Sequence, residues 1–122
     1  MNKNDLSLLG KNFDGQTVLI TGHTGFKGSW LTAWLKQLGA KVVGIALDPP
    51  TEPSHFGAAQ MADEMTDLRI DVCNQVALEE AVISTQPDFV FHLAAQPLVR
   101  RSYDNPVETW QTNVLGTLHV LE

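Results

Sequence analysis

The chain has 122 residues, of which 43% are hydrophobic and 18% charged, and its formal net charge is −6. This length allows one modest core, and a negative chain whose only cation cluster is Arg100-Arg101 argues against nucleic acid as a partner. The single Cys73 cannot form an internal disulfide, and the four histidines lack metal-site spacing. No apolar run reaches the ~20 residues of a membrane span, and residues 1–13 lack a signal-peptide core. We therefore expect a cytoplasmic protein with no membrane partner.

The first predicted elements form a β-α-β unit. Residues 1–16 are polar and end in the turn pair Asp14-Gly15, so they are interpreted as an N-terminal extension. A short apolar run predicts a buried strand, and the next apolar positions have helical spacing up to a glycine stop. The unit consists of a strand over Val18–Ile20, a helix over Trp30–Leu38 and a second strand over Lys41–Leu47.

Three glycines, Gly22, Gly25 and Gly28, separate the first strand from the first helix with the spacing Gly-x-x-Gly-x-x-Gly. Glycines placed this way permit a tight turn, let the backbone approach a pyrophosphate and let the helix pack close to the strand. The first-turn N–H groups and the helix dipole would face the anion. A Walker A loop is excluded because Lys27 precedes Gly28 instead of following it. The sequence therefore predicts a dinucleotide-binding turn.

The alternation of strands and helices continues to the end of the chain. Its predicted members are a short helix within Ser54–Met65 with Ser54 as N-cap, a strand over Leu68–Val72, a helix capped by Asn74, and a strand over Phe89–Ala94. A last helix begins with a capping box of Asn105 and Glu108, with Pro106 at the first position. Its apolar face comprises Val107, Trp110, Val114, Leu118 and Leu121.

This order of elements predicts an α/β fold, a Rossmann-like doubly wound parallel sheet over residues 17–122 with strand order 3-2-1-4. The fourth strand would be an open edge, and the last helix has no terminator, so the chain is interpreted as the N-terminal portion of a longer protein. The three tryptophans are assigned to the core, and His92 is expected to be a satisfied core residue. His55 and His119 are expected at the surface.

Several strings resemble one known family. TGHTGFKG, Asp71-Val72, HLAA at His92–Ala95 and TNVLGT at Thr112–Thr117 are similar to the extended short-chain dehydrogenase/reductases, which include nucleotide-sugar epimerases and dehydratases. The longer strings GHTGFKGSWL, PPTEPSHF and FHLAAQPLVRRSYDNPVETWQTNVLGT resemble the CDP-glucose 4,6-dehydratases of that family. The resemblance extends from about Thr17 to the C-terminus.

The resemblance implies a set of binding residues. The glycine turn would line the pyrophosphate, Asp71 would accept from the adenine amino group, and the residues after the fourth strand would pass the nicotinamide ribose. The implied cofactor-binding residues are Gly22, His23, Gly25, Phe26, Lys27, Gly28, Asp71, Val72, Ala94, Ala95, Gln96 and Asn113. The implied substrate-binding residues are Gln96, Arg100, Arg101 and Ser102.

Other interpretations stay open for the polar residues of this set. Lys27 could bind phosphate or be a solvated charge, and His23 could contact the phosphate or cap the helix. Asp71 could instead cap the helix that follows it. Arg100 and Arg101 could be solvated, or could bind a diphosphate through their guanidinium groups.

The cofactor is predicted to be NAD. An acid that grips the adenosine ribose is expected at the end of the second strand, near Ala46, whereas Asp48 comes two residues later. No Lys or Arg lies between Lys41 and Arg69, so we expect that a 2′-phosphate would meet no cation there. The lack of a cation to bind a 2′-phosphate favours NAD over NADP.

The resemblance implies a hydro-lyase that converts CDP-glucose to CDP-4-keto-6-deoxyglucose and forms a homodimer or higher homo-oligomer. No catalytic residue is assigned within this sequence, because the family's Tyr-x-x-x-Lys is absent and the only tyrosine, Tyr103, has Val107 in the lysine position. The segment alone is therefore expected to bind nucleotide without turnover. The alternatives are an epimerase, a GDP-mannose or dTDP-glucose dehydratase, or a non-catalytic NAD-binding module.

Overall fold

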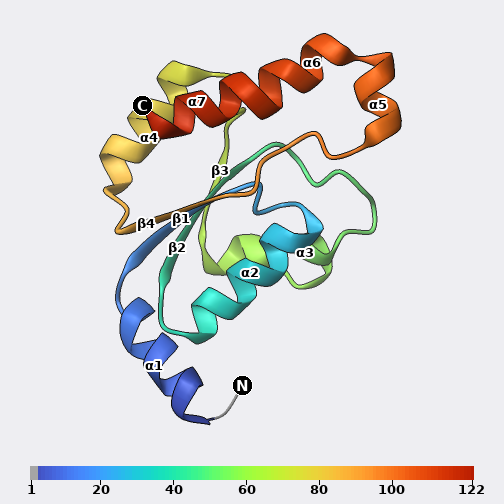
Figure 1. Ribbon diagram of the computed structural model, residues 1–122. Coiled ribbons are helices and arrows are strands. Elements are labelled where there is room, and N and C mark those ends of the chain that lie inside the picture. The colour runs from blue at the N-terminus through green and yellow to red at the C-terminus, as the bar shows by residue number, and fades with distance from the viewer. Residues whose placement is uncertain (1–2) are drawn as a thin grey trace.

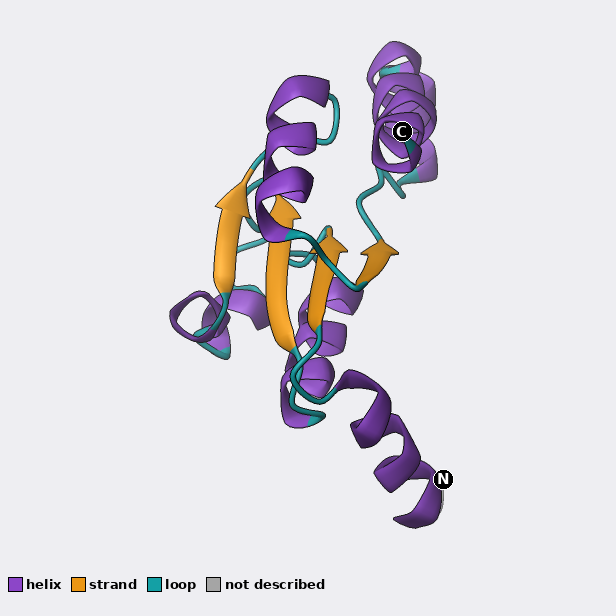
Figure 2. Cartoon of the chain, turned by 90° about the vertical axis from the view of Figure 1, so that its left-hand side faces the viewer, coloured by secondary structure: helices purple, strands orange, loops and turns teal. Residues whose placement is uncertain are grey.

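The computed structural model describes the backbone of residues 3–122 and the side chains of residues 7–122. Four parallel strands form one sheet in the order β3-β2-β1-β4, which confirms the predicted order (Figure 1). Figure 2 shows all four strands running in the same direction. Their bounds are β1 (Thr17–Thr21), β2 (Lys41–Ala46), β3 (Thr66–Arg69) and β4 (Phe89–His92).

The helices connect these strands and continue beyond the last one. They are α1 (Lys3–Phe13), α2 (Phe26–Gln37), α3 (His55–Ala58), a 3₁₀ turn (Met61–Glu64), α4 (Gln75–Thr85), α5 (Val99–Asp104), α6 (Pro106–Trp110), a π-helical turn (Gln111–Leu115) and α7 (Gly116–Leu121). Within residues 3–122, no helix is long and apolar enough to cross a membrane.

The sheet separates two apolar layers. Because side chains alternate along a strand, Val18 and Ile20 of β1 pack against Leu35 of α2 on one face. Leu19 points to the other face and packs with Leu78 and Ala81 of α4. Figure 1 accordingly shows α2 and α3 on one side of the sheet and α4 and α7 on the other. Burial of both faces accounts for the continuous apolar sequence of β1.

Several predicted boundaries and elements differ from the structure. Helix α1 lies within the polar extension, where no helix was predicted, and its Phe13 ring contacts Phe89 of β4 at 5.2 Å between centroids. Strand β3 begins two residues before the predicted Leu68 and ends before Asp71, and β4 ends at His92. Helix α5 was not predicted, because six residues are too few to show helical periodicity.

Helix caps were predicted with mixed success. Ser54 and Asn74 accept hydrogen bonds from the N–H groups of Gly57 and Ala77 at 3.0 and 3.2 Å, which confirms both caps. The capping box at Asn105 is wrong, because the Asn105 side chain makes no cap bond. Asn105 also ends α5, with its N–H donating to the Arg101 carbonyl at 2.8 Å, and this second role sets its backbone conformation.

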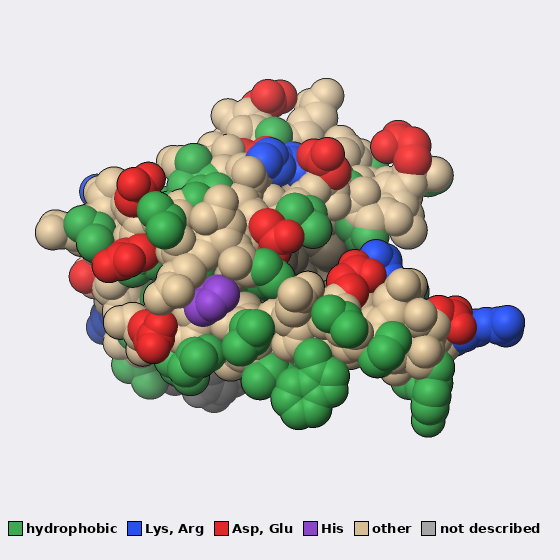
Figure 3. Space-filling view, turned by 90° about the horizontal axis from the view of Figure 1, so that it is seen from above, with side chains coloured by type: hydrophobic (Ala, Val, Ile, Leu, Met, Phe, Trp, Pro, Cys, Tyr) green, Lys and Arg blue, Asp and Glu red, His purple; other side chains and the backbone are tan. Residues whose placement is uncertain are grey.

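The outer face of the last helices is apolar and exposed. Within residues 7–122, Trp110 is 67% exposed and Trp30 and Trp34 are 54% and 43% exposed, so the assignment of the tryptophans to the core is wrong. The sheet ends at β4, and in the described chain no further strand lies beneath these helices. Figure 3 shows hydrophobic side chains along the edge that α6 and α7 form. Its members are Val107, Trp110, Val114, Leu118 and Leu121.

Candidate dinucleotide site at the carboxyl edge of the sheet

The glycine turn joins the end of β1 to the start of α2. Gly22 has φ +77°, and a Cβ built on it would lie 2.7 Å from the Ala94 nitrogen. A Cβ on Gly28 would lie 2.1 Å from the Gly22 carbonyl oxygen, so only glycine fits at both positions. Gly25 is the N-cap residue of α2, and no side chain caps that helix. The first-turn N–H groups are therefore left to bind an anion.

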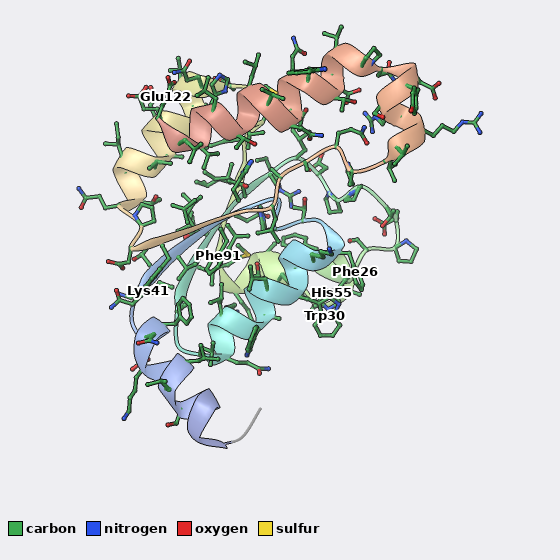
Figure 4. All side chains as sticks on the ribbon, viewed as in Figure 1. Phe26, Trp30, Lys41, His55, Phe91 and Glu122 are labelled. Atoms are coloured by element: carbon green, nitrogen blue, oxygen red, sulfur yellow. The ribbon has the colours of Figure 1, made fainter. Side chains whose placement is uncertain are left out.

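Exposed side chains surround the start of α2. Phe26 and Lys27 are exposed, and Lys27 forms no ion pair among the described residues. Figure 4 shows Phe26, Trp30 and His55 close together there. The His55 ring stacks on Trp30 at 4.1 Å, and its Nδ1 lies 2.8 Å from Ser29 Oγ. His55 is thus half-buried against α2, not fully at the surface as expected.

The segment after β4 lies beside the glycine turn. The hydroxyl of Thr21 accepts hydrogen bonds from the N–H groups of Leu93 and Ala94, at 3.1 and 3.2 Å. The same oxygen lies 2.6 Å from Nδ1 of His92. The absence of a Cβ on Gly22 lets Ala94 approach this closely. The two predicted parts of the site, the turn and the segment after β4, therefore adjoin.

Gln96 and Asn113 are brought together across the same edge. The Gln96 N–H donates to Asn113 Oδ1 at 2.8 Å, and Asn113 Nδ2 donates to the Gln96 carbonyl at 3.1 Å. Asn113 lies in the π-helical turn, a distortion that often accompanies functional sites. The side chain of Gln96 binds Thr109 Oγ1 at 3.1 Å, so this loop is held firmly on the last helices.

His92 is satisfied, as predicted. Its Nε2 lies 3.0 Å from Thr117 Oγ1, and its Nδ1 contacts Thr21. Burial lowers the pKa of His92. The ring therefore ties β4 to β1 and α7 and serves the packing of the fold.

Asp71 and Val72 follow β3 in a tight turn. Asp71 Oδ1 accepts from the Cys73 N–H at 2.9 Å, while Asn74 caps α4, so the interpretation of Asp71 as the cap is wrong. The Val72 side chain is 4% exposed and packs under Gly116, where a Cβ would lie 2.7 Å from Val72 Cγ2. That side chain leaves little surface for an adenine ring. His119 donates from Nδ1 to the Val72 carbonyl at 2.8 Å and is half-buried.

The His23 side chain neither caps α2 nor points toward a phosphate. It is fully buried, and its Nε2 donates to Asp67 Oδ1 of β3 at 2.8 Å. A Cβ on Gly44 of β2 would lie 2.3 Å from His23 Cγ, so the ring occupies space that Gly44 leaves free. Desolvation lowers the pKa of His23, against the opposing effect of Asp67. Both interpretations of the His23 side chain are therefore wrong, since it packs into the sheet.

A cation lies at the end of β2, contrary to prediction. The pairing of Ala46 with Arg69 puts Arg69 beside the end of β2, although the two are far apart in the sequence. Its Nη1 donates to the Leu47 carbonyl and to Asp48 Oδ1, both at 3.2 Å. The expectation of no cation near a 2′-phosphate is therefore wrong, because it counted residues along the chain and not across the sheet.

Arg100, Arg101 and Ser102 lie together on α5. Arg101 Nη2 donates to Glu108 at 2.6 Å, and Ser102 Oγ donates to the Val99 carbonyl at 2.5 Å. Arg100 is exposed and makes no ion pair with any described residue. The structure thus groups these residues beyond Gln96, at the outer end of the carboxyl edge.

Sequence reasoning missed residues that connect the parts of this edge. Thr24 Oγ1 donates to the Leu47 carbonyl at 2.9 Å and joins the glycine turn to the end of β2. The guanidinium of Arg69 lies over the Phe56 ring, and its Nη2 donates a hydrogen bond to Asp67 Oδ2. The contacts of Thr24 with Leu47 and of Phe56 with Arg69 join residues far apart in the sequence. Only the position of Thr24 within the glycine motif could have indicated its role.

The fold and this edge define a Rossmann-like domain of the extended short-chain dehydrogenase/reductase class. The family model described as GDP-mannose 4,6 dehydratase matches residues 19–122, and the chain belongs to that family. It is 50% identical over 116 residues to the CDP-glucose 4,6-dehydratase of Salmonella typhimurium, covering 94% of this chain and 32% of that protein.

Solved structures share the fold. An epimerase from Methanothermobacter thermautotrophicus superposes with a TM-score of 0.81 at 31% identity, covering 95% of this chain and 33% of that one. A UDP-glucose 4-epimerase of Thermus thermophilus in complex with NAD gives a TM-score of 0.72 at 30% identity, over 86% of this chain and 32% of that one. The chain spans about a third of the length of these relatives.

Proposed function

We propose that the protein carrying this sequence is an NAD-dependent sugar-nucleotide 4,6-dehydratase that acts on CDP-glucose. The observation that carries the substrate assignment is the 50% identity with the Salmonella CDP-glucose 4,6-dehydratase. The complex of the Thermus epimerase with NAD supports the choice of cofactor. Because the chain spans only a third of these relatives, the activity is proposed for the whole protein.

The residues of the glycine turn fit a dinucleotide. Gly22 and Gly28 leave space that a Cβ would fill, and the uncapped start of α2 would face the pyrophosphate with Lys27 beside it. Ala94, Ala95 and Gln96 would pass along the nicotinamide ribose, positioned by Asn113. Asp71 would bind the adenine amino group. NAD, when bound, would supply hydride transfer between C4 and C6 of the sugar.

The proposed reaction balances without net oxidation. The C4 hydroxyl becomes a ketone by loss of a hydride and a proton, and the C6 hydroxyl leaves as water with the C5 proton. C6 then gains the hydride removed from C4, and C5 gains the proton released by the C4 hydroxyl. The proton transfers need a base such as the family's Tyr-x-x-x-Lys, which these 122 residues lack. This segment would bind the cofactor and, through Arg100 and Arg101, approach the substrate diphosphate.

The test is an assay of the whole protein with CDP-glucose, dTDP-glucose and GDP-mannose. We expect loss of one water from CDP-glucose, detected by mass spectrometry, and much slower reaction of the other two. No reaction with CDP-glucose would contradict the substrate assignment. Reaction with another of the three would instead support a different dehydratase of the same family.

A second candidate is a nucleotide-sugar epimerase, because two structures that share the fold carry that description. The same assay distinguishes an epimerase from a dehydratase, because an epimerase changes the configuration of the sugar and leaves the mass of the sugar nucleotide unchanged. A non-catalytic NAD-binding module would bind NAD and leave every sugar nucleotide unchanged. A cytoplasmic location and a homodimeric or higher state also remain proposals.

A further inference from the structure

Two consecutive residues of the glycine turn bind the strands beside β1. The Gly22 N–H donates to the Ile45 carbonyl of β2 at 2.8 Å, which ties the turn to the neighbouring strand. The next residue, His23, reaches one strand further, because its Nε2 donates to Asp67 Oδ1 of β3 at 2.8 Å. His23 therefore joins the turn to a strand that does not pair with β1.

The His23 ring is tightly enclosed. It is fully buried, and the Phe56 ring meets it edge-on at 5.2 Å between centroids. A Cβ on Gly44 would lie 2.3 Å from His23 Cγ, so the ring crosses β2 only where that strand has no side chain. Because a close-packed interior resists the displacement of a ring, Nε2 is held at Asp67.

The backbone of His23 contacts the start of α2. A Cβ on Gly28 would lie 2.8 Å from His23 Cα and 2.1 Å from the Gly22 carbonyl oxygen. The glycine turn and the first turn of α2 are therefore in close contact, and a shift of His23 would move the uncapped N–H groups of that helix. These are the N–H groups that a pyrophosphate would bind.

The hydrogen bonds assign the neutral form of the His23 ring. Nε2 carries the proton because it faces a carboxylate, which only accepts. Nδ1 is buried without a hydrogen-bond partner among the described residues, so a proton there would be an unsatisfied donor. Burial lowers the pKa of His23, and Arg69 adds to this effect against the opposing effects of Asp67 and the Ile45 carbonyl. The ring is therefore a neutral donor toward Asp67.

We propose that His23 is a positioning residue of the glycine turn, which holds the N–H groups of the turn and of α2 in place for a pyrophosphate through its hydrogen bond to Asp67. The proposal rests on the proposed function, since it requires that this turn bind the pyrophosphate of a dinucleotide. His23 acts on the ligand only through the backbone. Loss of its Nε2 donor should therefore weaken binding of the diphosphate and leave binding of adenosine, which has no phosphate, unchanged.

The experiment measures the binding of NAD, ADP and adenosine to the whole protein by calorimetry. His23→Gln keeps an N–H donor at the place of Nε2, whereas His23→Asn moves the donor to the place of Nδ1, from which it cannot reach Asp67. Gly44→Ala is a second test, because it displaces the ring without removing a polar group. Val82→Ala is the control for lost packing, since Val82 packs in the layer on the other face of the sheet.

In His23→Asn and Gly44→Ala we expect NAD and ADP to bind about tenfold more weakly, as for one hydrogen bond to a charged group, and adenosine to change by less than about twofold. His23→Gln should keep the wild-type affinities for NAD and ADP, and Val82→Ala should leave all three affinities unchanged. Equal affinities of His23→Asn and His23→Gln for ADP, or an equal loss for adenosine and ADP, overturn the inference alone. A wild-type protein that binds neither NAD nor ADP overturns the cofactor assignment of the proposed function as well.

Discussion

Gln96 and Asn113 bind each other through two hydrogen bonds, from the Gln96 N–H to Asn113 Oδ1 at 2.8 Å and from Asn113 Nδ2 to the Gln96 carbonyl at 3.1 Å. This pair fixes the loop after β4 on the π-helical turn between α6 and α7. Replacing Asn113 with Ala leaves both backbone groups of Gln96 without a protein partner. We expect a loss of about 1–3 kcal/mol in the free energy of unfolding, measured by urea denaturation, and weaker NAD binding.

Gln111→Ala is the control for this change, because Gln111 lies on the same turn and its exposed side chain forms no hydrogen bond within residues 7–122. Equal effects of the two substitutions would mean that the turn, and not the Asn113 amide, fixes the loop.

The glycines of the turn should differ in their tolerance of a methyl group. A Cβ on Gly28 would lie 2.1 Å from the Gly22 carbonyl oxygen, whereas one on Gly25 would lie 3.3 Å from it. Gly28→Ala should therefore lower the free energy of unfolding by about 1–3 kcal/mol through overpacking, and Gly25→Ala by less. Thermal unfolding of both variants checks this order.

Gly10→Ala is the matched control in helix α1, because a Cβ there meets nothing within 4 Å. It should raise the free energy of unfolding by about 0.5–1 kcal/mol, since alanine loses less entropy in a helix than glycine. A larger cost at Gly25 than at Gly28 would contradict the packing described for the turn.

Acidification should destabilise the fold through His23 and His92. Burial lowers the pKa of both below the ordinary value of 6.5, so the unfolded chain binds protons more readily than the folded one. Their contribution is fully present above about pH 6.5 and is lost as the pH falls toward their folded-state pKa values. Urea unfolding measured between about pH 7.5 and 5.5 should show this decline. We expect the urea concentration at the unfolding midpoint to fall steadily as the pH is lowered.

The variants His23→Gln and His92→Gln should each flatten part of this pH dependence, and the double variant should flatten most of it. An unchanged slope in the double variant would assign the effect to other groups. The measurement stops at about pH 5.5 because ordinary carboxylates begin to titrate below that value.

The exposed apolar face of α6 and α7 should mediate self-association. Trp110 is 67% and Val114 45% exposed on this face, and both line an open groove with Val107 and Leu115. Exposed apolar patches of this kind commonly mark interaction surfaces. In sedimentation velocity, the double variant Trp110→Glu/Val114→Asp should shift the protein toward the monomer.

Val76→Asp is the control, because Val76 is 66% exposed on α4 and does not line that groove. A wild-type protein that sediments as a monomer at every concentration would contradict the assignment of this face.

Local sequence patterns predicted the fold well. The apolar runs of β1 and β2 and the cap at Asn74 each depend on a few neighbouring residues, and these three predictions were confirmed. The failures have local causes too. Helix α1 lies in a segment that was interpreted as a polar extension, and β3 has only one apolar residue, Leu68, among its four positions.

The polar half of the site could not be predicted, because it depends on pairing across the sheet. Arg69 reaches Asp48 only because β3 pairs with β2 in the register Ala46 to Arg69. His23 reaches Asp67 only because β2 lies between them with a glycine at the crossing point. Neither relation has a signal in the spacing of residues along the chain.

The missing side chain at Gly44 has a consequence for how this sequence can change over time. The His23 ring fills the volume that a Cβ at position 44 would need. A larger residue at position 44 is therefore compatible with the fold only after position 23 has become small, and the reverse order leaves a cavity beside Asp67. Among homologous chains, the side-chain volumes at positions 23 and 44 should therefore covary, which links the glycine turn to the centre of β2.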